Sequence, residues 1–350
     1  MIPDDTILIC GGAGYIGSHV TRCLYNRKCR LIVVDNLSTG HSASLPREVE
    51  LVVGSIGDRA FLESIFASHK ISAVVDLCAN AYVQESVLDP RKYYDNNVVN
   101  GLVLLKTMLD FKVKNIVFSS SCTVYGRPEF LPVDEHCRIA PVSPYGHTKA
   151  IFEQIMADFC KAYGLHYVAL RYFNAAGAYL DASIGEDHSP ETHLVPLVLR
   201  QALHLEYPEL FQGESIPMQI YGNDYETHDG TCMRDYIHVM DLATAHFTAL
   251  KYLNDGGEAM ALNLANECGF TNLELVQMCS RITGREIPYE IVDRRPGDSG
   301  VLVGASGKAR EVLNWKPEYS DIETIIGSAW RWHRRMPEGF PPESTECNFK

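Results

Sequence analysis

TILICGGAGYIG, at residues 6 to 17, joins a short apolar run to a cluster of glycines. Residues 6 to 10 are typical of a buried β-strand, and a helical pattern continues from residue 18 to residue 25. GAGYIG, at 12 to 17, is therefore Gly-x-Gly-x-x-Gly between a strand and a helix, where glycines permit a tight turn and a close approach of the backbone. The helix N-terminus offers amide donors to a pyrophosphate. The stretch predicts a Rossmann-type fold that binds a dinucleotide.

A second apolar run, Leu31 to Val34, ends in the carboxylate of Asp35, roughly 20 residues past the glycine loop. At that place a carboxylate accepts hydrogen bonds from ribose hydroxyls and repels a 2′-phosphate. The sequence therefore favours NAD over NADP as the cofactor.

The segment SPYGHTK carries Tyr145 and Lys149 four residues apart. Pro144 can open a helix at its first turn, and positions i and i+4 of a helix share one face. A phenol has a pKa of about 10 and is a poor base at neutral pH, but a nearby ammonium lowers that pKa. Upstream, Ile116 to Phe118 is typical of a buried strand that delivers Ser119 to Ser121 at its C-terminal end, where ligands bind in open α/β sheets. Together these patterns predict dehydrogenase chemistry.

With 350 residues, 46% hydrophobic and 21% charged, the chain can bury a large core and exceeds one ordinary domain, so two lobes are expected. The net charge of -13 is spread without long runs, which argues against a nucleic acid or an anionic membrane surface as a partner. No apolar stretch approaches about 20 residues, and no basic segment followed by an apolar one opens the chain. We expect a cytoplasmic protein.

Cysteine and histidine usage gives no sign of a metal centre. The 11 cysteines are scattered without a Cys-x-x-Cys pair, so reduced thiols are expected. The 13 histidines show no zinc-binding spacing. His188 and His193 around Glu191 could be drawn as ligands, but we expect no metal.

Strands and helices alternate through the first half of the chain, which predicts an α/β fold with a doubly wound parallel sheet and a smaller α/β C-terminal substrate lobe. Residues 1–174, with a return segment at about 235–250, are expected to form the NAD-binding domain. The substrate lobe is expected at 175–234 and 251–340, and a tail at 341–350. The expected strands are 6–10, 31–35, 50–53, 73–77, 116–119, 167–171 and 236–239, and the expected helices are 15–27, 59–68, 91–111, 145–163, 194–205, 272–283 and 321–334.

Further motifs accompany these elements. They are GGAGYIGSH at 11–19, DNL at 35–37, YYDNN at 93–97, SSS at 119–121, TVYG at 123–126, RYFN at 171–174, GNDY at 222–225, RDYIHV at 234–239 and RPGD at 295–298. With them, the chain resembles the extended short-chain dehydrogenase/reductases, and within that family the nucleotide-sugar 4-epimerases, from about residue 6 to about residue 340.

The resemblance implies a reaction. Tyr145 would take the proton from the sugar O4 while C4 gives hydride to NAD, with Ser121 and Thr123 hydrogen-bonding the oxygen. The 4-keto sugar would then rotate about its phosphate link and take the hydride back on its other face, so NAD would stay bound. Lys149 would also hold the nicotinamide ribose. The expected substrate is a UDP-sugar, either UDP-glucose and UDP-galactose or the UDP-N-acetylhexosamines.

The resemblance also implies the binding residues. The cofactor set is Gly11, Gly14, Tyr15, Ile16, Gly17, Asp35, Asn36, Ser55, Ile56, Leu77, Cys78, Ala79, Asn96, Ser119, Tyr145, Lys149 and Tyr172. The substrate set is Ser121, Tyr145, Asn174, His193, Leu194, Gln219, Tyr221, Arg234, Arg295, Asp298 and Leu302, with the arginines at the diphosphate. A homodimer is expected through helices 91–111 and 145–163. Their apolar residues are Val98, Val99, Leu102, Leu105, Phe152, Ile155, Met156 and Phe159.

Three positions depart from the family pattern. Ser55 replaces an aspartate at the adenine, and Ala81 replaces a lysine near the nicotinamide, which bears on how tightly NAD is held. Leu302 replaces the tyrosine that gates the sugar pocket in narrow-specificity members and leaves room for a 2-acetamido group; alternatively Ser121, Thr123 and His193 set the preference. The segment 81–83 is also similar to that of pentose-acting relatives.

Other functions of the same fold fit the residues less well. A 4,6-dehydratase would need an acidic pair at Cys122 and Thr123, and a decarboxylase a glutamate there. An NAD-sensing or inactive paralogue would tolerate loss of Tyr145 or Lys149, yet both are present. A UDP-sugar 4-epimerase is therefore the preferred interpretation.

Overall fold

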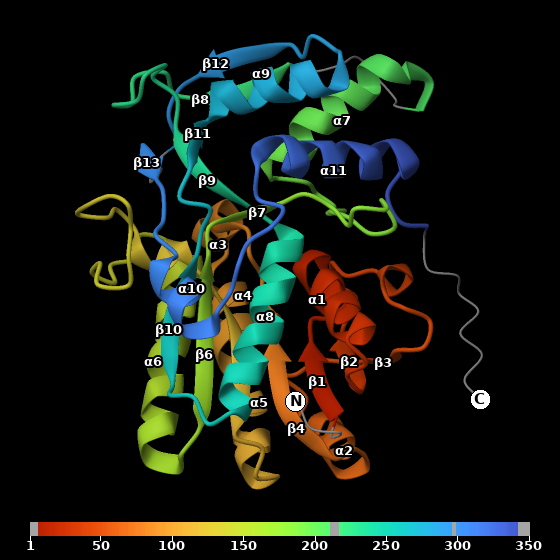
Figure 1. Cartoon of the computed structure of the whole chain (residues 1–350), viewed down its shortest axis with the longest axis vertical. Coiled ribbons are helices and arrows are strands. Elements are labelled where there is room, and N and C mark those ends of the chain that lie inside the picture. The colour runs from red at the N-terminus through yellow and green to blue at the C-terminus, as the bar shows by residue number, and fades with distance from the viewer. Residues whose placement is uncertain (1–5, 211–216, 296–298, 342–350) are drawn as a thin grey trace.

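The computed structural model describes residues 6–210, 217–295 and 299–341. Its main sheet has seven parallel strands in the order β10-β6-β5-β4-β1-β2-β3. They are β1 (Thr6–Cys10), β2 (Leu31–Asp35), β3 (Glu50–Val53), β4 (Ile71–Asp76), β5 (Asn115–Ser121), β6 (His166–Tyr172) and β10 (Met260–Leu264). Because β1 lies between β2 and β4, the chain winds outward in both directions from the sheet centre (Figure 1). This confirms the doubly wound Rossmann-type sheet.

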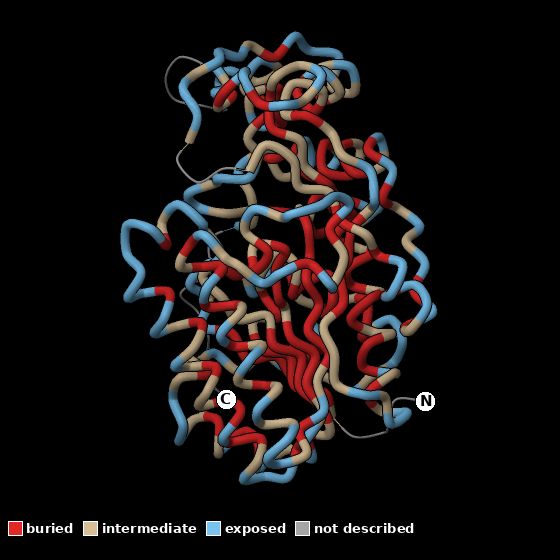
Figure 2. Tube along the Cα trace, turned by 90° about the vertical axis from the view of Figure 1, so that its left-hand side faces the viewer, coloured by how far each residue is buried: buried red, intermediate tan, exposed pale blue. Residues whose placement is uncertain are grey.

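Helices cover both faces of the sheet. One face carries α1 (Tyr15–Asn26), α8 (Val239–Asn254) and α10 (Gly307–Leu313), and the other carries α2 (Arg59–Ser68), α5 (Gly101–Asp110) and α6 (Pro144–Tyr163). Successive residues of β1 alternate between the two cores, with Ile7 and Ile9 in one and Leu8 and Cys10 in the other. The strands are therefore buried on both sides, as the red centre of Figure 2 shows.

A smaller α/β lobe lies beyond the carboxyl end of the main sheet (Figure 1). Its helices are α7 (Leu194–Glu206), α9 (Asn272–Thr283) and α11 (Ile322–Arg335), and its strands are β7 (Asn174–Ala176), β8 (Met218–Tyr221), β9 (Met233–His238), β11 (Gly269–Thr271), β12 (Tyr289–Val292) and β13 (Val301–Leu302). The helices share an apolar core with Ile220 and Tyr236. The expected second lobe is thus present.

The main sheet extends further along the chain than expected, because β10 forms its edge beside β6. The chain therefore returns to the first lobe at β10 and again at α10, both beyond the return segment expected at about 235–250. The limits of the two domains themselves stay a prediction.

The helix expected at 91–111 is interrupted. It consists of α4 (Pro90–Tyr94), the π-helical segment η2 (Asp95–Asn100) and α5. A π turn is wider than an α turn and often marks a functional site. Here it buries Asn97, which is 5% exposed. The other short elements are η1 (Ser42–Ser44), α3 (Val83–Leu88), η3 (Cys122–Tyr125) and η4 (Pro208–Leu210).

The apolar helix residues expected at a dimer interface differ in exposure. Leu105, Phe152 and Met156 are fully buried in the core under α5 and α6, so they cannot contribute to an interface. Val99 is 54% exposed, and Ile151, an α6 residue outside the expected set, is 39% exposed. Among the described residues, no helix combines the length and apolar character that crossing a bilayer requires. The ten described cysteines are free thiols.

Candidate active site

The glycine loop forms a turn between β1 and α1 that only glycine can build. Gly11 has a φ of 76°, and a Cβ on Gly17 would stand 2.0 Å from the Gly11 carbonyl oxygen. Gly14 is the N-cap of α1 and lends the helix no side-chain hydrogen bond, so the first backbone amides of α1 are not capped by a side chain. A Cβ on Gly14 would meet only the Gly11 oxygen, at 3.5 Å. The turn therefore presents uncapped donors to an anion.

Asp35, at the end of β2, braces this loop. Its Oδ2 accepts a hydrogen bond from Ala13 N at 2.9 Å, and its Oδ1 accepts one from Leu37 N at 2.9 Å. The side chain is buried at 6% exposure. Each carboxylate oxygen has a second lone pair, so Asp35 can also accept from a ribose hydroxyl.

Most of the predicted cofactor residues lie along the carboxyl edge of the main sheet. Because its strands are parallel, their carboxyl ends meet at one edge. The edge is formed by the residues that end or directly follow β1 to β6: Gly11, Gly14, Tyr15, Ile16, Gly17, Asp35, Asn36, Ser55, Ile56, Leu77, Cys78, Ala79, Ser119 and Tyr172. Ser55 Oγ accepts from Gly57 N at 3.1 Å and so shapes the turn after β3.

Tyr172 has an internal partner. Its hydroxyl lies 2.7 Å from His246 Nε2, in the core beneath α8. His246 Nδ1 lies 2.8 Å from the Leu242 carbonyl oxygen. Burial lowers the pKa of His246 to about 4, so the neutral ring donates from Nδ1 and accepts the Tyr172 hydroxyl at Nε2. The hydroxyl of Tyr172 therefore makes a hydrogen bond inside the core.

Tyr145 and Lys149 lie on the first turns of α6 and are buried, at 9% and 2% exposure. The helix starts there because Ser143 Oγ accepts a backbone hydrogen bond at 3.1 Å and Pro144 occupies the first turn. Lys149 Nζ lies 5.8 Å from the centre of the Tyr145 ring and donates to the Ser119 carbonyl oxygen at 2.7 Å. The sequence prediction that this pair lies together is confirmed by the geometry.

Burial dominates the electrostatics of this pair. It raises the pKa of Tyr145 to about 12, although a hydrogen bond with Ser121 acts in the opposite direction. Burial lowers the pKa of Lys149 to about 8, and Asp76 opposes that shift. Thr123 Oγ1 donates to Ser121 Oγ at 3.0 Å. Ser121, Thr123, Tyr145 and Lys149, the residues predicted to be catalytic, therefore lie in one connected group.

Asp76, which the sequence analysis did not select, ends β4 on the same edge and is 2% exposed. Its Oδ1 accepts from Cys78 N at 3.0 Å. Burial raises the pKa of Asp76 to about 6, while the charge of Lys149 lowers it. The strand position was visible in the sequence, but the approach to Lys149 depends on how α6 packs on the sheet.

Asn97 fixes the start of α6 against the loop after β4. Its Nδ2 donates to Thr148 Oγ1 at 3.1 Å and to the Asn80 carbonyl oxygen at 3.0 Å, while its Oδ1 accepts from Asn80 N at 2.9 Å. Asn96, the predicted cofactor residue, donates to the same Oδ1 at 3.0 Å. Sequence reasoning missed Asn97 because its role depends on the π turn of η2.

A buried ion pair sets α6 against β6. Arg171 Nε donates to Glu153 Oε1 at 3.0 Å, and its Nη1 donates to the Tyr125 hydroxyl at 2.8 Å. Tyr125 in turn donates to Asn263 Oδ1 at 2.7 Å, and Ser120 donates to Glu153. The network joins α6, β5, β6 and β10 and so holds the strand end that carries Ser121.

The predicted substrate residues near the sheet edge come together on the small sheet. Asn174 Nδ2 donates to the Asp235 carbonyl oxygen at 2.9 Å, and Arg234 in β9 is the register partner of Leu302 in β13. Leu302 packs against the apolar cluster that includes Cys122, Val124 and Tyr125 of η3. These residues therefore adjoin the segment of Ser121 and Thr123.

Gln219, Tyr221 and Arg295 form a second group, on β8 and the segment after β12. The Arg295 guanidinium lies 3.6 Å from the centre of the Tyr221 ring, and the Tyr221 hydroxyl donates to Gln219 Oε1 at 2.8 Å. The Tyr221 ring is thus covered by the guanidinium of Arg295, one of the arginines expected at the diphosphate. Asp298 lies outside the described residues.

His193 and Leu194 lie at the start of α7. His193 is its N-cap, and its Nδ1 lies 2.6 Å from Glu186 Oε1. Burial favours the neutral ring, but the charges of Glu186 and Glu191 raise the pKa of His193 to about 10. The N-terminal dipole of α7 favours an anion here, whereas the His193 ring faces the carboxylates of Glu186 and Glu191.

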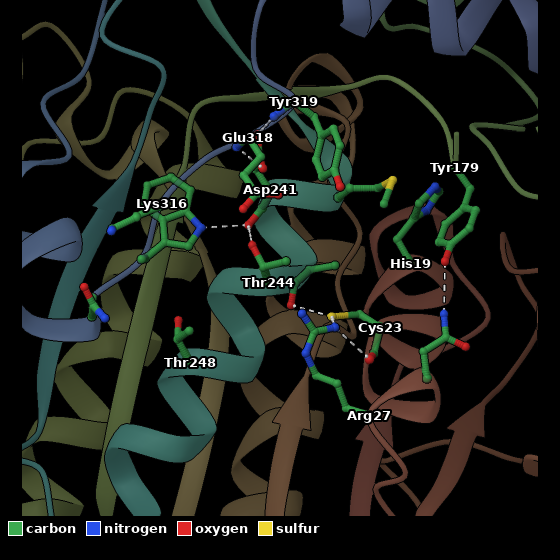
Figure 3. A pocket seen from close by; sticks show the side chains of 15 residues that line it. His19, Cys23, Arg27, Tyr179, Asp241, Thr244, Thr248, Lys316, Glu318 and Tyr319 are labelled. Atoms are coloured by element: carbon green, nitrogen blue, oxygen red, sulfur yellow. Dashed lines mark hydrogen bonds between the residues drawn. The ribbon is translucent and has the colours of Figure 1, made fainter. Parts of the chain in front are cut away.

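A cavity of about 430 Å³ lies elsewhere, between α1, α8 and the segment 314–319 (Figure 3). Asp241 is one of the residues that line the cavity, and its carboxylate accepts hydrogen bonds from Ser320 Oγ at 2.6 Å and from Tyr319 N at 2.9 Å. Trp315 Nε1 donates to the Asp241 carbonyl oxygen at 3.0 Å. None of the predicted site residues lines this cavity.

Known proteins resemble this chain over nearly its whole length. The model of the NAD dependent epimerase/dehydratase family matches residues 7–265. The UDP-glucose 4-epimerase of Lacticaseibacillus casei is 47% identical over 335 residues, 96% of this chain and 98% of that protein. A crystal structure of UDP-glucose 4-epimerase superposes with a TM-score of 0.91 at 43% identity, over 97% of this chain and 100% of that one. The Bifidobacterium longum UDP-glucose 4-epimerase, crystallised with NAD+ and UDP, gives a TM-score of 0.88 at 36% identity, over 96% of this chain and 100% of that one.

Proposed function

The chain belongs to the NAD-dependent epimerase/dehydratase family, and from that membership we propose that it catalyses the NAD-dependent 4-epimerisation of UDP-glucose and UDP-galactose. One observation carries the proposal: Tyr145 and Lys149 are buried together with Ser121, at the sheet edge that also carries the dinucleotide turn. A base, a cation and a hydroxyl donor at that place are the groups that oxidation of a sugar alcohol needs.

The residues present fit NAD. The first amides of α1 are uncapped by a side chain, and the position of a Gly14 side chain is open apart from one contact at 3.5 Å, so a pyrophosphate can approach. Asp35 would hold the adenine ribose and Lys149 the nicotinamide ribose. When bound, NAD supplies a hydride acceptor that later returns the hydride.

In this proposal the chain moves one proton. Tyr145, as a phenolate, takes the proton from the sugar O4. It returns the proton after the sugar has rotated. Lys149 stabilises the phenolate through space, because its ammonium lies 5.8 Å from the ring centre. Ser121, steadied by Thr123, hydrogen-bonds the reacting oxygen. The diphosphate stays anchored at Asn174, Arg234 and the start of α7 while the 4-keto sugar rotates.

The residues beside Ser121 argue against elimination chemistry. A dehydratase would need an acidic pair at Cys122 and Thr123. Cys122 is instead buried, and burial raises the pKa of its thiol to about 12. Neither side chain can remove or supply the second proton at neutral pH, which favours epimerisation.

Leu302 bears on which sugars the enzyme accepts. It is half-buried against the apolar cluster of η3 and lacks the ring of a tyrosine, so we infer that the pocket accepts UDP-N-acetylhexosamines as well as UDP-hexoses. UDP-pentoses remain the next candidates, in keeping with the segment 81–83.

We also infer a homodimer built on η2, α5 and α6, and a cytoplasmic location.

Incubation with UDP-glucose, UDP-GlcNAc and UDP-xylose, each with and without added NAD, tests the proposal by chromatography of the 4-epimers. We expect UDP-galactose from UDP-glucose. Failure to form any 4-epimer, by protein that retains its fold and is supplied with NAD, would refute the activity.

A further inference from the structure

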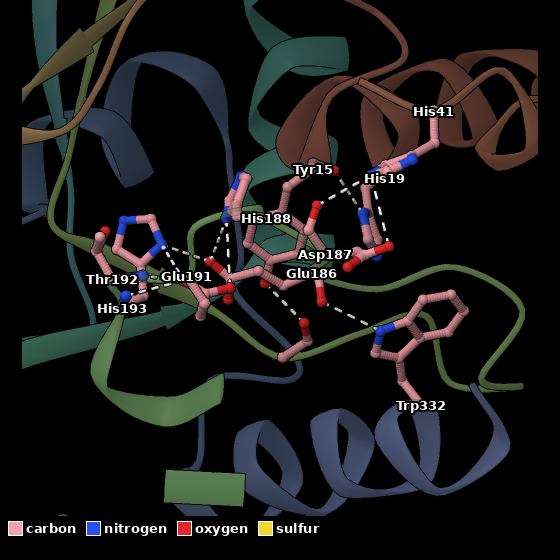
Figure 4. A network of polar contacts seen from close by, with 11 residues as sticks. Tyr15, His19, His41, Glu186, Asp187, His188, Glu191, Thr192, His193 and Trp332 are labelled. Carbon is pink, nitrogen blue, oxygen red and sulfur yellow. Dashed lines mark hydrogen bonds and ion pairs between the residues drawn. The ribbon is translucent and has the colours of Figure 1, made fainter. Parts of the chain in front are cut away.

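Four side chains of the loop before α7 converge on one small volume: Glu186, His188, Glu191 and His193 (Figure 4). One donor atom from each lies within 4.8 Å of all the others. In the part of the chain that the structure describes, no other group of three or more His, Cys, Asp or Glu side chains comes close enough to share an ion. Because the loop reads Glu-x-His-x-x-Glu-x-His, one short segment supplies all four.

The spacing of these atoms suits an ion better than a set of hydrogen bonds. His193 Nδ1 is 2.6 Å from Glu186 Oε1, which is a hydrogen-bond distance. His188 Nδ1 is 3.4 Å from Glu186 Oε1 and 3.5 Å from Glu191 Oε2, and His193 Nδ1 is 3.5 Å from Glu191 Oε1. In a tetrahedral site with bonds of about 2.0 to 2.2 Å, neighbouring donor atoms lie about 3.3 to 3.6 Å apart. Three of the four separations fall at that spacing.

The charge and burial of the two glutamates also favour a bound cation. The side chains of Glu186 and Glu191 are only 4% and 3% exposed. Two buried carboxylates repel each other and lose their hydration, so they require two positive charges nearby. Protonated His188 and His193 can supply these charges, since the two glutamates raise the pKa of both rings. A divalent cation supplies both charges in one atom and leaves the two imidazoles neutral as ligands. His188 Nδ1 is buried, and its nearest carboxylate oxygens lie at 3.4 Å and 3.5 Å, longer than a normal hydrogen bond, which leaves a nitrogen ligand available.

The backbone of the loop is already held in place. Glu191 Oε1 accepts from Thr192 N at 2.7 Å and from His193 N at 2.9 Å. The Glu186 carbonyl oxygen accepts from Trp332 Nε1 of α11 at 3.2 Å. Partners of this kind orient metal ligands before the ion arrives.

Aromatic rings enclose the other side of the group. Tyr15 and Tyr82 both stand edge-on to His188, with ring centres 6.2 Å and 6.0 Å away. They fix the plane of the imidazole and limit the approach of water. Tyr15 belongs to the dinucleotide turn, so the group lies between that turn and the second lobe.

We propose that Glu186, His188, Glu191 and His193 form a binding site for one divalent transition-metal ion such as Zn²⁺, through two imidazole nitrogens and two carboxylate oxygens. Mixed nitrogen and oxygen ligands of this kind suit Zn²⁺ and its neighbours in the first transition row. The ion ties the loop that starts α7 to the side of the dinucleotide turn. It has no part in the hydride and proton transfers of the epimerisation.

The test uses the full chain after removal of metal with a chelator. Zn²⁺ affinity and stoichiometry are measured by competition with a chromogenic chelator, and Co²⁺ is added as a spectroscopic probe of geometry. We expect one Zn²⁺ per chain and the intense visible bands of tetrahedral Co²⁺. His188→Gln and Glu186→Gln are expected to lower the affinity at least about 100-fold, because even indirect partners of a metal are worth about 10- to 100-fold.

His228→Gln is the matched control. His228 also pairs with a glutamate, Glu274, at 3.1 Å, but on the surface and without a second histidine. Its variant should bind Zn²⁺ like the wild type. Equal affinity in the wild type and His188→Gln, or loss of binding in His228→Gln alone, would overturn the proposal.

His188→Cys separates a metal ligand from a purely ionic role. A thiolate can ligate the ion but cannot replace an imidazolium. With Co²⁺ this variant should show a new near-ultraviolet thiolate-to-metal band, and its absence would contradict the site. If His188→Gln does not fold, this spectrum decides the question.

Discussion

The ammonium of Lys149 lies 5.8 Å from the centre of the Tyr145 ring, and its own hydrogen bond goes to the Ser119 carbonyl oxygen, at 2.7 Å. The cation therefore acts on the phenol through space. Burial raises the pKa of Tyr145 to about 12 in spite of the hydrogen bond with Ser121, so the charges around the bound cofactor and Lys149 must supply the remaining stabilisation of the phenolate.

Tyr145→Phe removes the base and leaves the ring. We expect fold and NAD content to persist while turnover falls at least about 100-fold, the usual scale for a general base. Tyr93→Phe is the control, because Tyr93 is fully buried, stacks edge-on at 6.5 Å from Tyr145 and donates to Glu85. Steady-state kinetics that show similar turnover for both variants would remove Tyr145 from the mechanism.

Gly14→Val should abolish NAD binding without unfolding the chain. An added Cβ meets only one protein atom, at 3.5 Å, and Gly14 has β-region backbone angles (φ -72°, ψ 175°), so we expect the fold to accept the side chain while the pyrophosphate does not. NAD released on denaturation is the measurement. Gly307→Ala, which adds a Cβ in open space, should keep its NAD.

Since Ser55 and Ala81 depart from the family pattern, wild-type activity should rise when NAD is added.

Asp76→Asn should change how stability depends on pH. The folded pKa of Asp76, about 6, lies above the ordinary value of 3.8, so its contribution to stability is fully present below about pH 4 and is lost as the pH rises through 6. A displacement of that size is worth about 3 kcal/mol. Relative to the wild type, the variant should therefore gain up to about that amount between pH 4 and pH 7.

Urea unfolding at both pH values measures the Asp76 effect. Asp110→Asn, at a surface carboxylate that is 52% exposed, serves as the control. If the stabilities of the wild type and Asp76→Asn depend on pH in the same way, the pKa of Asp76 is not raised in the folded protein.

Leu302→Tyr should narrow the sugar range. A ring at the gate fills volume beside the sugar C2 substituent, and one misplaced methylene-sized contact is worth about 1 to 3 kcal/mol. The ratio of kcat/KM for UDP-GlcNAc to that for UDP-glucose should fall at least about tenfold. Leu302→Met, which conserves volume, should leave the ratio close to the wild type. If the tyrosine variant keeps both its NAD and its ratio, the preference resides instead in Ser121, Thr123 and His193.

Replacing Val99 and Ile151 together by glutamate should yield a monomer. These side chains are 54% and 39% exposed on η2 and α6, and charges there would oppose an isologous contact. Light scattering at micromolar concentration gives the mass. Leu205→Glu, at 39% exposure on α7, should stay a dimer. A wild-type chain that is already monomeric would contradict the assembly.

Local pattern was enough to predict much of the fold. The bounds of β1, β2 and β3 agree with the sequence prediction residue by residue, and α6 begins one residue early because Ser143 caps it. Tyr145 and Lys149 were found because i and i+4 spacing is itself local information. The glycine turn was recognised for the same reason.

What the sequence did not reveal depends on tertiary contacts. Asn97 and Asp76 acquire their roles only when α6 packs on β4 and β5. An apolar helix face looks the same whether it covers a sheet or a second subunit, so Phe152 was assigned to an interface although it is core. Glu186 did have a local signal, since it stands two residues before His188, but the approach of all four side chains required the fold.

The late arrival of β10 has a consequence for biosynthesis. The sixth strand, β6, ends at Tyr172, and its edge partner β10 begins only at Met260. At a synthesis rate of about 5 to 20 residues per second, the ribosome needs roughly 4 to 18 seconds to make that interval. Throughout it, the nascent sheet carries an edge of unpaired amides and carbonyls along β6 that another strand could join. The cofactor-binding half of this chain therefore cannot mature before much of the sugar-binding half has been translated.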